Sequence, residues 1–261
     1  MLASLDGKLV DSLVLPIQDA GFLYGYGAFE TLKIAAGEAQ HVFLHLERMS
    51  QTVRFLGIDY SFDYDKIESQ IAALIKINGL QEAVLNLYLT AGVRQQGVVF
   101  GPSQLAMVMR PFPPLQVSQR LSLKQDFCAR TVFDTHKTLA YIRPVYEKRH
   151  LEDGDDVILY SESGEVLEST VSNVFFVKGR TLFSPRLGQI LPGIIRHVLI
   201  EKCRKNGYVV EECRIDHSEL TEFEELFLTN SLMGIMPVSE VVGYPGLYSK
   251  SVTQQVMTFL E

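Results

Sequence analysis

The sequence has few cysteines, and its histidines do not stand in a known metal-binding motif. The three cysteines, Cys128, Cys203 and Cys213, are odd in number and lack Cys-x-x-Cys spacing. They indicate neither a disulfide framework nor a zinc site. His41 and His45 have the i,i+4 spacing of one helix face, but the sequence shows no acidic or cysteine partner that completes a metal set. We therefore expect no metal ion.

Features that mark several other classes of protein are also missing. The chain has no Gly-x-Ser-x-Gly nucleophile elbow and no phosphate loop of the Gly-x₄-Gly-Lys-Ser/Thr type. It has no cluster of lysine and arginine, and its net charge of −7 disfavours a nucleic-acid partner. Its apolar runs are too short to span a membrane, and residues 1–12 carry charges where a signal peptide has an apolar core. We expect a cytoplasmic protein without a nucleic-acid or membrane partner.

The composition that remains is that of a globular protein. The chain has 261 residues, of which 47% are hydrophobic and 21% are charged. This length suffices for two domains with apolar cores. The segment RPFPPLQVSQR is rich in proline and indicates a linker. We predict a smaller N-terminal α+β domain over 1–113, a linker over 114–120 and a larger C-terminal α/β domain over 121–261, with the site in the cleft between the domains.

Local patterns predict the main elements. The pair Asp6-Gly7 between short apolar runs predicts a hairpin turn. Apolar residues at helical spacing predict one helix that ends at Gly57 and a second that ends at Gly79. A further helix is predicted to begin near Lys137, with Pro144 early in it or breaking it.

One lysine raises a question of its own. Lys137 lies in the run DTHKTLAYIRP, which is otherwise weakly charged and partly apolar. It can be a surface lysine whose stem covers apolar neighbours. It can also be a lysine partly removed from water that acts as an amine nucleophile. The stretch alone leaves both interpretations open.

Other segments supply groups that complement an amine. Glu168 ends a predicted strand, and Pro192-Gly193 precedes a predicted helix whose first N–H groups suit an anion. Residues 229–231 place Thr, Asn and Ser at a strand end, and Arg48 lies on a predicted helix. Each feature also has a structural interpretation, as a surface charge or an ordinary turn. Together they are the parts of a pyridoxal phosphate site: a lysine, an acid for the pyridine nitrogen and a phosphate cradle.

The order of these segments resembles the fold-type IV pyridoxal-phosphate enzymes, which include branched-chain and D-amino-acid aminotransferases and 4-amino-4-deoxychorismate lyase. The resemblance covers nearly the whole chain. It is carried by six blocks in the family order: GFLYGYGAFETLK, HLERM, HKTLAYI, GEVLESTVSNVFFV, SPRLGQILPGIIRHVL and LTNSLMGIMPV. The fold it implies has two α/β domains, and the C-terminal domain binds pyridoxal 5'-phosphate.

The resemblance also implies roles for individual residues. Lys137 would form the Schiff base with the cofactor, and Glu168 would pair with the pyridine nitrogen. Tyr141 would lie near the cofactor ring. The phosphate would be held by a set of four residues, through backbone N–H groups or side chains: Arg48, Ile194, Ile195 and Ser231. A homodimer is implied as well, because family sites are completed by a neighbouring loop.

Three features favour the lyase within this family. Thr31 stands where the resembling aminotransferases tend to have glycine or an apolar residue, and in the lyases this threonine lies near the reacting atoms. Asn230 in LTNSLMGIMPV matches the lyase version of that block, and the chain is short. The predicted reaction converts 4-amino-4-deoxychorismate to 4-aminobenzoate and pyruvate, a step of folate biosynthesis, with Lys137 as general base and Thr31 assisting proton delivery.

Two other functions stay open on the sequence. One is an aminotransferase for branched-chain L-amino acids or D-amino acids, and the other is a pyridoxal-phosphate-binding protein without catalysis. The chain departs from the family pattern at Ala20 and Tyr26, and Arg94 is displaced from the expected arginine positions. Arg94 is kept as a candidate ligand for a substrate carboxylate, and Asn230 as a candidate substrate contact.

Overall fold

The computed structural model describes residues 1–114, 118–244 and 250–260. These residues divide into two units, each of which is described by itself. The first unit comprises Met1–Pro114 together with His136–Tyr141, and the second comprises the rest of the described chain. Residues 115–117 of the predicted linker lie outside the described residues, and the last two residues of that linker already belong to a strand.

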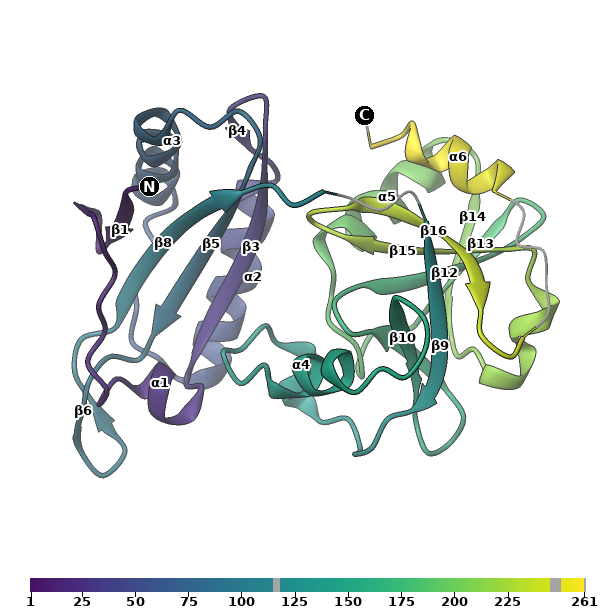
Figure 1. The fold of residues 1–261 in the computed structure, drawn as a ribbon, viewed down its shortest axis with the longest axis horizontal. Helices are drawn as coiled ribbons and strands as arrows, with labels where there is room; N and C mark the ends of the chain where they lie inside the picture. Colours follow the sequence, from purple (N-terminus) through teal and green to yellow (C-terminus); the bar gives the residue numbers. More distant parts are fainter. Residues whose placement is uncertain (115–117, 245–249, 261) are drawn as a thin grey trace. The chain divides into compact units, whose positions relative to one another are not determined.

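The first unit is built on an antiparallel sheet of six strands (Figure 1). Its strand order is β2-β1-β8-β5-β3-β4. In that order the bounds are Lys8–Val10, Ala3–Leu5, Gln104–Pro111, Ala83–Thr90, Gly27–Ala35 and Glu38–Ala39. The turn between β1 and β2 places Asp6 and Gly7 at positive φ, as the predicted hairpin requires.

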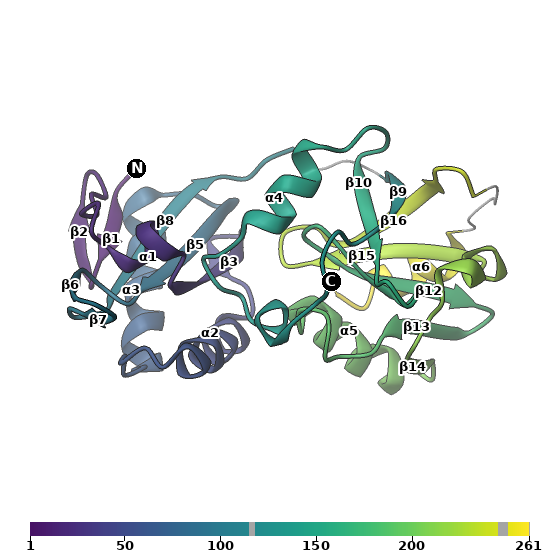
Figure 2. The ribbon, with the colours of Figure 1, turned by 90° about the horizontal axis from the view of Figure 1, so that it is seen from below.

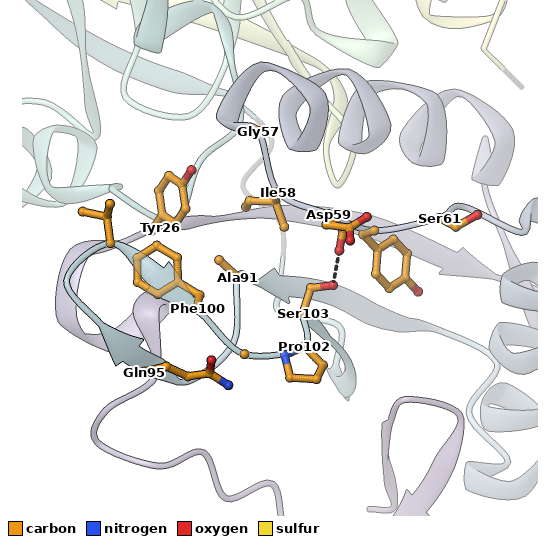
Figure 3. Close-up of a pocket in the computed structure, with 13 residues that line it drawn as sticks. Tyr26, Gly57, Ile58, Asp59, Ser61, Ala91, Gln95, Phe100, Pro102 and Ser103 are labelled. Carbon is orange, nitrogen blue, oxygen red and sulfur yellow. Dashed lines mark hydrogen bonds between the residues drawn. The ribbon is translucent and has the colours of Figure 1, made fainter.

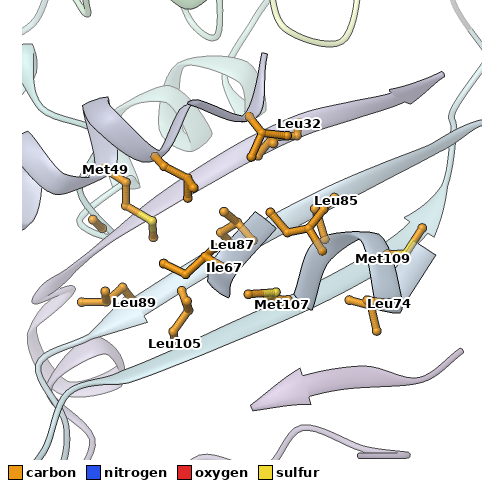
Figure 4. Packing of buried hydrophobic residues seen from close by; sticks show 14 of the residues in the cluster. Leu32, Met49, Ile67, Leu74, Leu85, Leu87, Leu89, Leu105, Met107 and Met109 are labelled. Atoms are coloured by element: carbon orange, nitrogen blue, oxygen red, sulfur yellow. The ribbon is translucent and has the colours of Figure 1, made fainter. Parts of the chain in front are cut away.

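Two helices cover one face of this sheet. They are α2 (Val42–Leu56) and α3 (Tyr64–Asn78), and they end at Gly57 and Gly79, both in the left-handed conformation, as predicted. Figure 4 shows their apolar side chains packed against Leu32 and the leucines of β5. Because side chains alternate along a strand, the opposite face of β3 carries Phe29 and Thr31.

Smaller elements complete the first unit. Helix α1 (Ala20–Tyr24) is capped by Asp19, whose side chain accepts a hydrogen bond from the Gly21 N–H group. Strands β6 (Arg94–Gln96) and β7 (Val99–Phe100) form a separate hairpin.

The second unit contains a mixed sheet of eight strands. Its order is β11-β10-β9-β16-β15-β12-β13-β14. In that order the bounds are Val166–Ser169, Asp156–Tyr160, Gln119–Gln125, Gly234–Val241, Glu225–Asn230, Asn173–Lys178, Thr181–Pro185 and Val209–Cys213. Pairing is parallel on both sides of β9 and between β13 and β14, and antiparallel elsewhere.

Apolar clusters lie on two sides of this second sheet. Phe175 and Phe227 pack with residues of α5 (Ile194–Lys205) and α6 (Ser251–Met257). Both helices are labelled in Figure 2. A second cluster includes Phe176 and Leu228, from the same two strands, together with Leu220. Leu220 lies in a short 3₁₀ helix, η2 (His217–Glu222).

The helix predicted to begin near Lys137 begins later, at Ile142. Helix α4 spans Ile142–Arg149, and a 3₁₀ turn, η1, spans Val132–Thr135. Pro144 lies in the first turn of α4, where its missing N–H group costs no helical hydrogen bond. Lys137 therefore lies in irregular backbone between two helical segments, and this part of the prediction is wrong.

None of the helices in the described ranges combines the length with the apolar character that is needed to cross a bilayer.

Candidate active site

Lys137 is held in place by the backbone of β3. The Phe29 N–H group donates to the Lys137 carbonyl oxygen at 3.0 Å, and the Leu139 N–H group donates to the Gly27 carbonyl oxygen at 2.9 Å. These bonds align the lysine segment along the strand, with an antiparallel bridge between Ala28 and Thr138. A position defined by backbone hydrogen bonds is well suited to a reacting lysine.

Gly27, the first residue of β3, and Gly25, two residues before it, permit this close approach. A Cβ atom at Gly27 would lie 2.6 Å from Leu139 Cδ1 and would overlap the Leu89 carbonyl oxygen. A Cβ atom at Gly25 would lie 2.8 Å from the Cα of Ala140. The two glycines of GYGAF therefore allow the segment that carries Lys137 to pack closely against this backbone.

The Lys137 ammonium group lies against two aromatic rings. Its Nζ is 4.3 Å from the centroid of the Phe29 ring and 5.3 Å from that of Tyr141. The two rings meet edge to face, with centroids 5.0 Å apart. Aromatic faces attract a cation and exclude water on their side. Lys137 is partly buried, which favours the interpretation of a lysine partly removed from water over that of a freely solvated one.

Thr31 lies on the same face of β3 as Phe29, two residues along the strand. Its hydroxyl oxygen accepts a hydrogen bond from Asn86 Nδ2 at 2.9 Å. Asn86 Nδ2 also lies 3.5 Å from the Glu30 carbonyl oxygen, which can only accept. Since Asn86 donates to it, the Thr31 hydroxyl keeps its own proton for another partner.

Arg48 lies behind β3, on the face that the helices cover. It is buried, and its Nε and Nη2 atoms donate to the Glu30 carboxylate at 2.8 and 2.7 Å. His45 Nδ1 lies 2.6 Å from the same carboxylate, and this is an acidic partner that the spacing of the histidines did not reveal. In the structure, Arg48 forms a buried ion pair with Glu30. The phosphate-binding role of Arg48 stays a prediction.

Neighbouring charges and burial determine the protonation states of Glu30 and His45. Burial alone would raise the pKa of Glu30, but Arg48 and His45 lower it to about 2. Burial lowers the pKa of His45, and the attraction of Glu30 offsets only part of that effect. Glu30 is therefore ionised and His45 neutral near pH 7.

In the second unit, Glu168 accepts hydrogen bonds from at least three donors in the described part of the chain. Arg130 Nη1 donates to Oε1 at 2.9 Å, and Oε2 accepts from the Leu191 N–H group at 3.1 Å and from Asn173 Nδ2 at 3.3 Å. Glu168 is only 9% exposed. A buried carboxylate with three donors is oriented and favoured in its ionised form, which is what a partner of a protonated pyridine nitrogen needs.

Helix α5 begins three residues after Leu191, whose N–H group donates to Glu168. Its N-cap residue is Gly193, and no side chain caps its first turn. A Cβ atom at Gly193 would overlap Asn173 Oδ1, so a larger residue there would displace the Asn173 side chain. Ile194 and Ile195 are buried at the start of the helix, and their N–H groups point along the axis, as phosphate-binding helix termini require.

Two buried hydroxyl groups next to these residues lack a hydrogen-bond partner within the described chain. They belong to Ser169, next to Glu168, and to Thr229. Thr229 pairs with Asn173 across β12 and β15, and Asn173 in turn lies against Gly193. A buried hydroxyl group that has no partner in the protein is suited to a polar ligand.

Asn230 is the last residue of β15, and Ser231 follows it. Asn230 Oδ1 accepts from the N–H groups of Leu232 and Met233 at 3.0 and 2.8 Å, and its Nδ2 donates to Ser172 Oγ at 3.0 Å. Asn230 thus builds the turn that carries Ser231. Its predicted contact with substrate stays a prediction beside this structural role.

The Arg94 side chain is hydrogen-bonded to a residue of α1. It is exposed on β6, and its Nη1 donates to the Tyr24 hydroxyl oxygen at 2.8 Å. No contact within the described part of the chain links it to Phe29 or to Thr31, and its role as a carboxylate ligand stays a prediction. It stays a candidate without a supporting contact.

The two departures from the family pattern have structural uses in the first unit. Ala20 is fully buried. Tyr26 donates through its hydroxyl to the Leu56 carbonyl oxygen, and its ring lies 5.3 Å from that of Phe100. Both aromatic residues line a surface pocket of about 690 Å³, which Figure 3 shows next to Asp59 and Ser103. None of the predicted site residues lines this pocket.

Sequence reasoning missed Arg130, Asn173 and Asn86. Arg130 and Asn86 contact predicted residues from elements that are distant in the chain, and a single sequence does not show such contacts. The buried Glu30 was missed for the same reason. Asn173 lies only five residues after Glu168, within the block GEVLESTVSNVFFV, and its contact with that carboxylate depends on how the chain turns between the two strands.

A family model, Amino-transferase class IV, matches residues 27–241. The chain belongs to this family. The match begins at the first residue of β3 and ends at the last residue of β16, so it spans the strand that holds Lys137, the Glu168 carboxylate and the α5 N-terminus.

Class IV relatives of two named activities are similar over most of the chain. An aminodeoxychorismate lyase of Bacillus subtilis is 30% identical over 88% of this chain and 82% of its own length. A protein of Methanocaldococcus jannaschii, described as "Putative branched-chain-amino-acid aminotransferase", is 29% identical over 92% of this chain and 87% of its own length. The family is thus established, and the choice between these activities is not.

The class IV fold is also seen in solved structures. A hypothetical aminotransferase from Mycobacterium tuberculosis, determined in a PLP-bound form, superimposes with a TM-score of 0.89. It is 21% identical, and the match covers 100% of this chain and 97% of that one. The predicted fold-type IV architecture is therefore confirmed.

Proposed function

We propose that this chain is a pyridoxal-phosphate-dependent lyase that converts 4-amino-4-deoxychorismate to 4-aminobenzoate and pyruvate. One observation carries the choice of lyase: Thr31 presents a hydroxyl on the face of β3 where Lys137 packs, and Asn86 leaves its proton for another partner. The 30% identity to a lyase supports it.

Pyridoxal 5'-phosphate is the cofactor, and the residues present suit each part of it. Lys137 supplies the amine for covalent attachment, and Tyr141 packs against that amine. Glu168 supplies a buried, oriented carboxylate for the pyridine nitrogen. The phosphate is assigned to the uncapped start of α5, with the Ser231 and Arg48 side chains, as anion binding at a helix N-terminus requires.

Further support for this fit comes from the partnerless hydroxyls of Ser169 and Thr229, which flank the proposed ligands of the ring and the phosphate. The placement of the site in the cleft between the two predicted domains stays a prediction.

The protein's own groups then have defined tasks. When bound, pyridoxal phosphate supplies an electron-withdrawing ring that stabilises negative charge on the carbon next to the substrate nitrogen. The Lys137 amine accepts a proton from the substrate, at the carbon of the substrate's own ring that bears the amino group. The bond between the ring and the enolpyruvyl oxygen breaks, and a proton from Lys137 or Thr31 converts the departing enolpyruvate to pyruvate. The ring that remains is aromatic, which makes the elimination favourable.

An aminotransferase is the second candidate, because a relative described as one is 29% identical. It would need a keto acid as acceptor, whereas the lyase needs none. A protein that binds the cofactor without turnover would release no product from either class of substrate.

The deciding experiment supplies freshly made 4-amino-4-deoxychorismate to the purified, cofactor-loaded protein without any keto acid. Equal amounts of pyruvate and 4-aminobenzoate over many turnovers are expected. A matched control is Lys178→Met, which removes an exposed lysine paired with Glu222 and should leave the rate unchanged. No product, together with amino-group transfer from an L- or D-amino acid to a keto acid, would replace the lyase by the aminotransferase.

We also propose that the protein is a cytoplasmic homodimer. Large apolar side chains are exposed on the first unit, among them Phe22 on α1, which is 70% exposed, and Val98 in the β6–β7 hairpin, which is 86% exposed. Such side chains favour burial against another protein surface. Sedimentation equilibrium of the purified protein tests the dimer.

A further inference from the structure

Arg130 is a buried arginine that contacts the Glu168 carboxylate directly. Its side chain is 6% exposed. Nη1 donates to Glu168 at 2.9 Å, and Nε donates to Asp126 at 2.7 Å. Burial alone would lower the pKa of Arg130, but Glu168 and Asp126 raise it overall. Asp134 Oδ1 also lies 3.9 Å from Arg130 Nη1, so Arg130 is a fixed cation among three carboxylates.

The ion pairs of Arg130 extend to Arg143, which lies just after the segment that carries Lys137. Asp126 also accepts from Arg143 Nη1 at 3.1 Å, and the same Nη1 lies 3.1 Å from Asp134 Oδ1. Arg130 precedes residues 136–141 in the chain, and Arg143 follows them. The network therefore ties together the two ends of the segment that carries Lys137, and it ties both to Glu168.

We propose that Arg130 is a positioning residue for the cofactor, acting through Glu168. It fixes Oε1 of the carboxylate and keeps the buried group ionised, so that the orientation needed by the pyridine nitrogen exists before the cofactor binds. This inference rests on the proposed cofactor site. Arg130 itself is not assigned a contact with cofactor or substrate.

The physical reason is the cost of a buried charge. A carboxylate taken out of water is stabilised only if it is paired and hydrogen-bonded. The N–H groups of Leu191 and Asn173 hold Oε2, and the contact of Arg130 is with Oε1. Without Arg130, the carboxylate loses the charged donor that holds Oε1, so its orientation is less constrained and its ionised form is less stabilised. Either change weakens its pairing with a protonated ring.

A double-mutant cycle tests this role, with the dissociation constant of pyridoxal phosphate as its readout. Arg130→Met is expected to weaken cofactor binding about tenfold in the wild-type background. In the Glu168→Gln background the same change is expected to alter the constant less than about twofold, because the charge it acts on has been removed. Equal losses in both backgrounds would overturn the proposal.

Two further variants keep the test decisive. Arg130→Lys retains a cation and is expected to recover part of the lost affinity, and it replaces Arg130→Met in the cycle if the methionine variant does not fold. Arg186→Met removes a two-bond ion pair with Glu165 in the same unit and should leave cofactor affinity unchanged. A loss with Arg186→Met as large as that with Arg130→Met would reduce the effect to general destabilisation and overturn the proposal.

Failure of the proposal is distinguishable from failure of the proposed function. If the wild type binds no pyridoxal phosphate, both are overturned. If the wild type binds it, and Arg130→Met binds it equally well, only the role of Arg130 is overturned. Lyase activity does not enter the measurement.

Discussion

Lys137 is joined to Phe29 twice, through its backbone and through its side chain. The Phe29 N–H group donates to the Lys137 carbonyl oxygen at 3.0 Å, and the Lys137 ammonium lies 4.3 Å from the centre of the Phe29 ring. The strand that positions the lysine also carries Thr31 on the same face. The same strand therefore positions both the amine and the hydroxyl that we assign to the reaction.

Replacing Lys137 by alanine removes both the covalent attachment and the general base. We expect product formation to fall by at least about 10³-fold, and we expect the absorbance of the lysine-bound cofactor to be absent. Absorption spectra after cofactor loading, with product release measured on the same sample, check both effects. Full activity in Lys137→Ala would remove the entire site assignment.

Replacing Thr31 by valine keeps a β-branched side chain of similar shape but removes the hydroxyl. We expect kcat for 4-aminobenzoate release to fall about 10- to 100-fold, while cofactor absorbance stays unchanged. Thr31→Ser, which restores the hydroxyl, should stay close to the wild type. Equal kcat values for the valine and serine variants would show that the hydroxyl does not move a proton in the rate-limiting step.

Asn86 controls where that hydroxyl points. Asn86→Asp exchanges the donor at Nδ2 for a carboxylate oxygen that can only accept, so the Thr31 proton is expected to turn toward it. We expect kcat to fall about tenfold in the wild-type background and to be unchanged in the Thr31→Val background. A similar fall in both backgrounds would indicate an effect that does not pass through Thr31.

Gly27→Ala tests the packing that brings the lysine segment to β3. The added Cβ would meet Leu139 Cδ1 and the Leu89 carbonyl oxygen, so the segment must move away from the strand. We expect a loss of about 1–3 kcal/mol in the free energy of unfolding, as for other overpacked sites, and weaker cofactor attachment. Gly101→Ala is the control, because its Cβ would meet nothing closer than 3.4 Å. Urea unfolding of both variants measures the difference.

Where local chemistry decides the structure, the sequence predicted it. Helices α2 and α3 end at Gly57 and Gly79, and the hairpin turn at Asp6 and Gly7 has the left-handed backbone that these residues favour. The blocks that surround Glu168 and Gly193 were likewise found from residue order. These features depend on neighbours in the chain, which a single sequence contains.

Where distant segments decide the structure, the prediction was incomplete or wrong. The residues after Lys137 have helical character, yet pairing with β3 keeps them out of the helix until Ile142. The pairing of Arg130 with Glu168 joins residues far apart in the chain. No periodicity marks such pairs, since the fold alone brings them together.

The buried ion pair of Glu30 and Arg48 makes the free energy of unfolding depend on pH in a defined direction. Arg48 and His45 hold the folded-state pKa of Glu30 at about 2, against an ordinary value of 4.5, despite its burial. Because the folded-state pKa is the lower one, the contribution of Glu30 to stability is fully present above about pH 4.5 and is lost as the pH falls toward about 2.

Glu30→Gln removes this contribution and leaves the buried Arg48 without its charged partner at 2.7–2.8 Å. At pH 7 we expect the free energy of unfolding to fall by about 3–5 kcal/mol, the usual effect of breaking a buried pair. The difference between wild type and variant should shrink as the pH falls below about 4.5, because protonation removes the same charge in the wild type. Urea unfolding at pH 7, 5 and 3.5 measures it, with Glu38→Gln as an exposed control. A difference that stays constant over this range would show that the charge of Glu30 does not stabilise the strand behind the lysine.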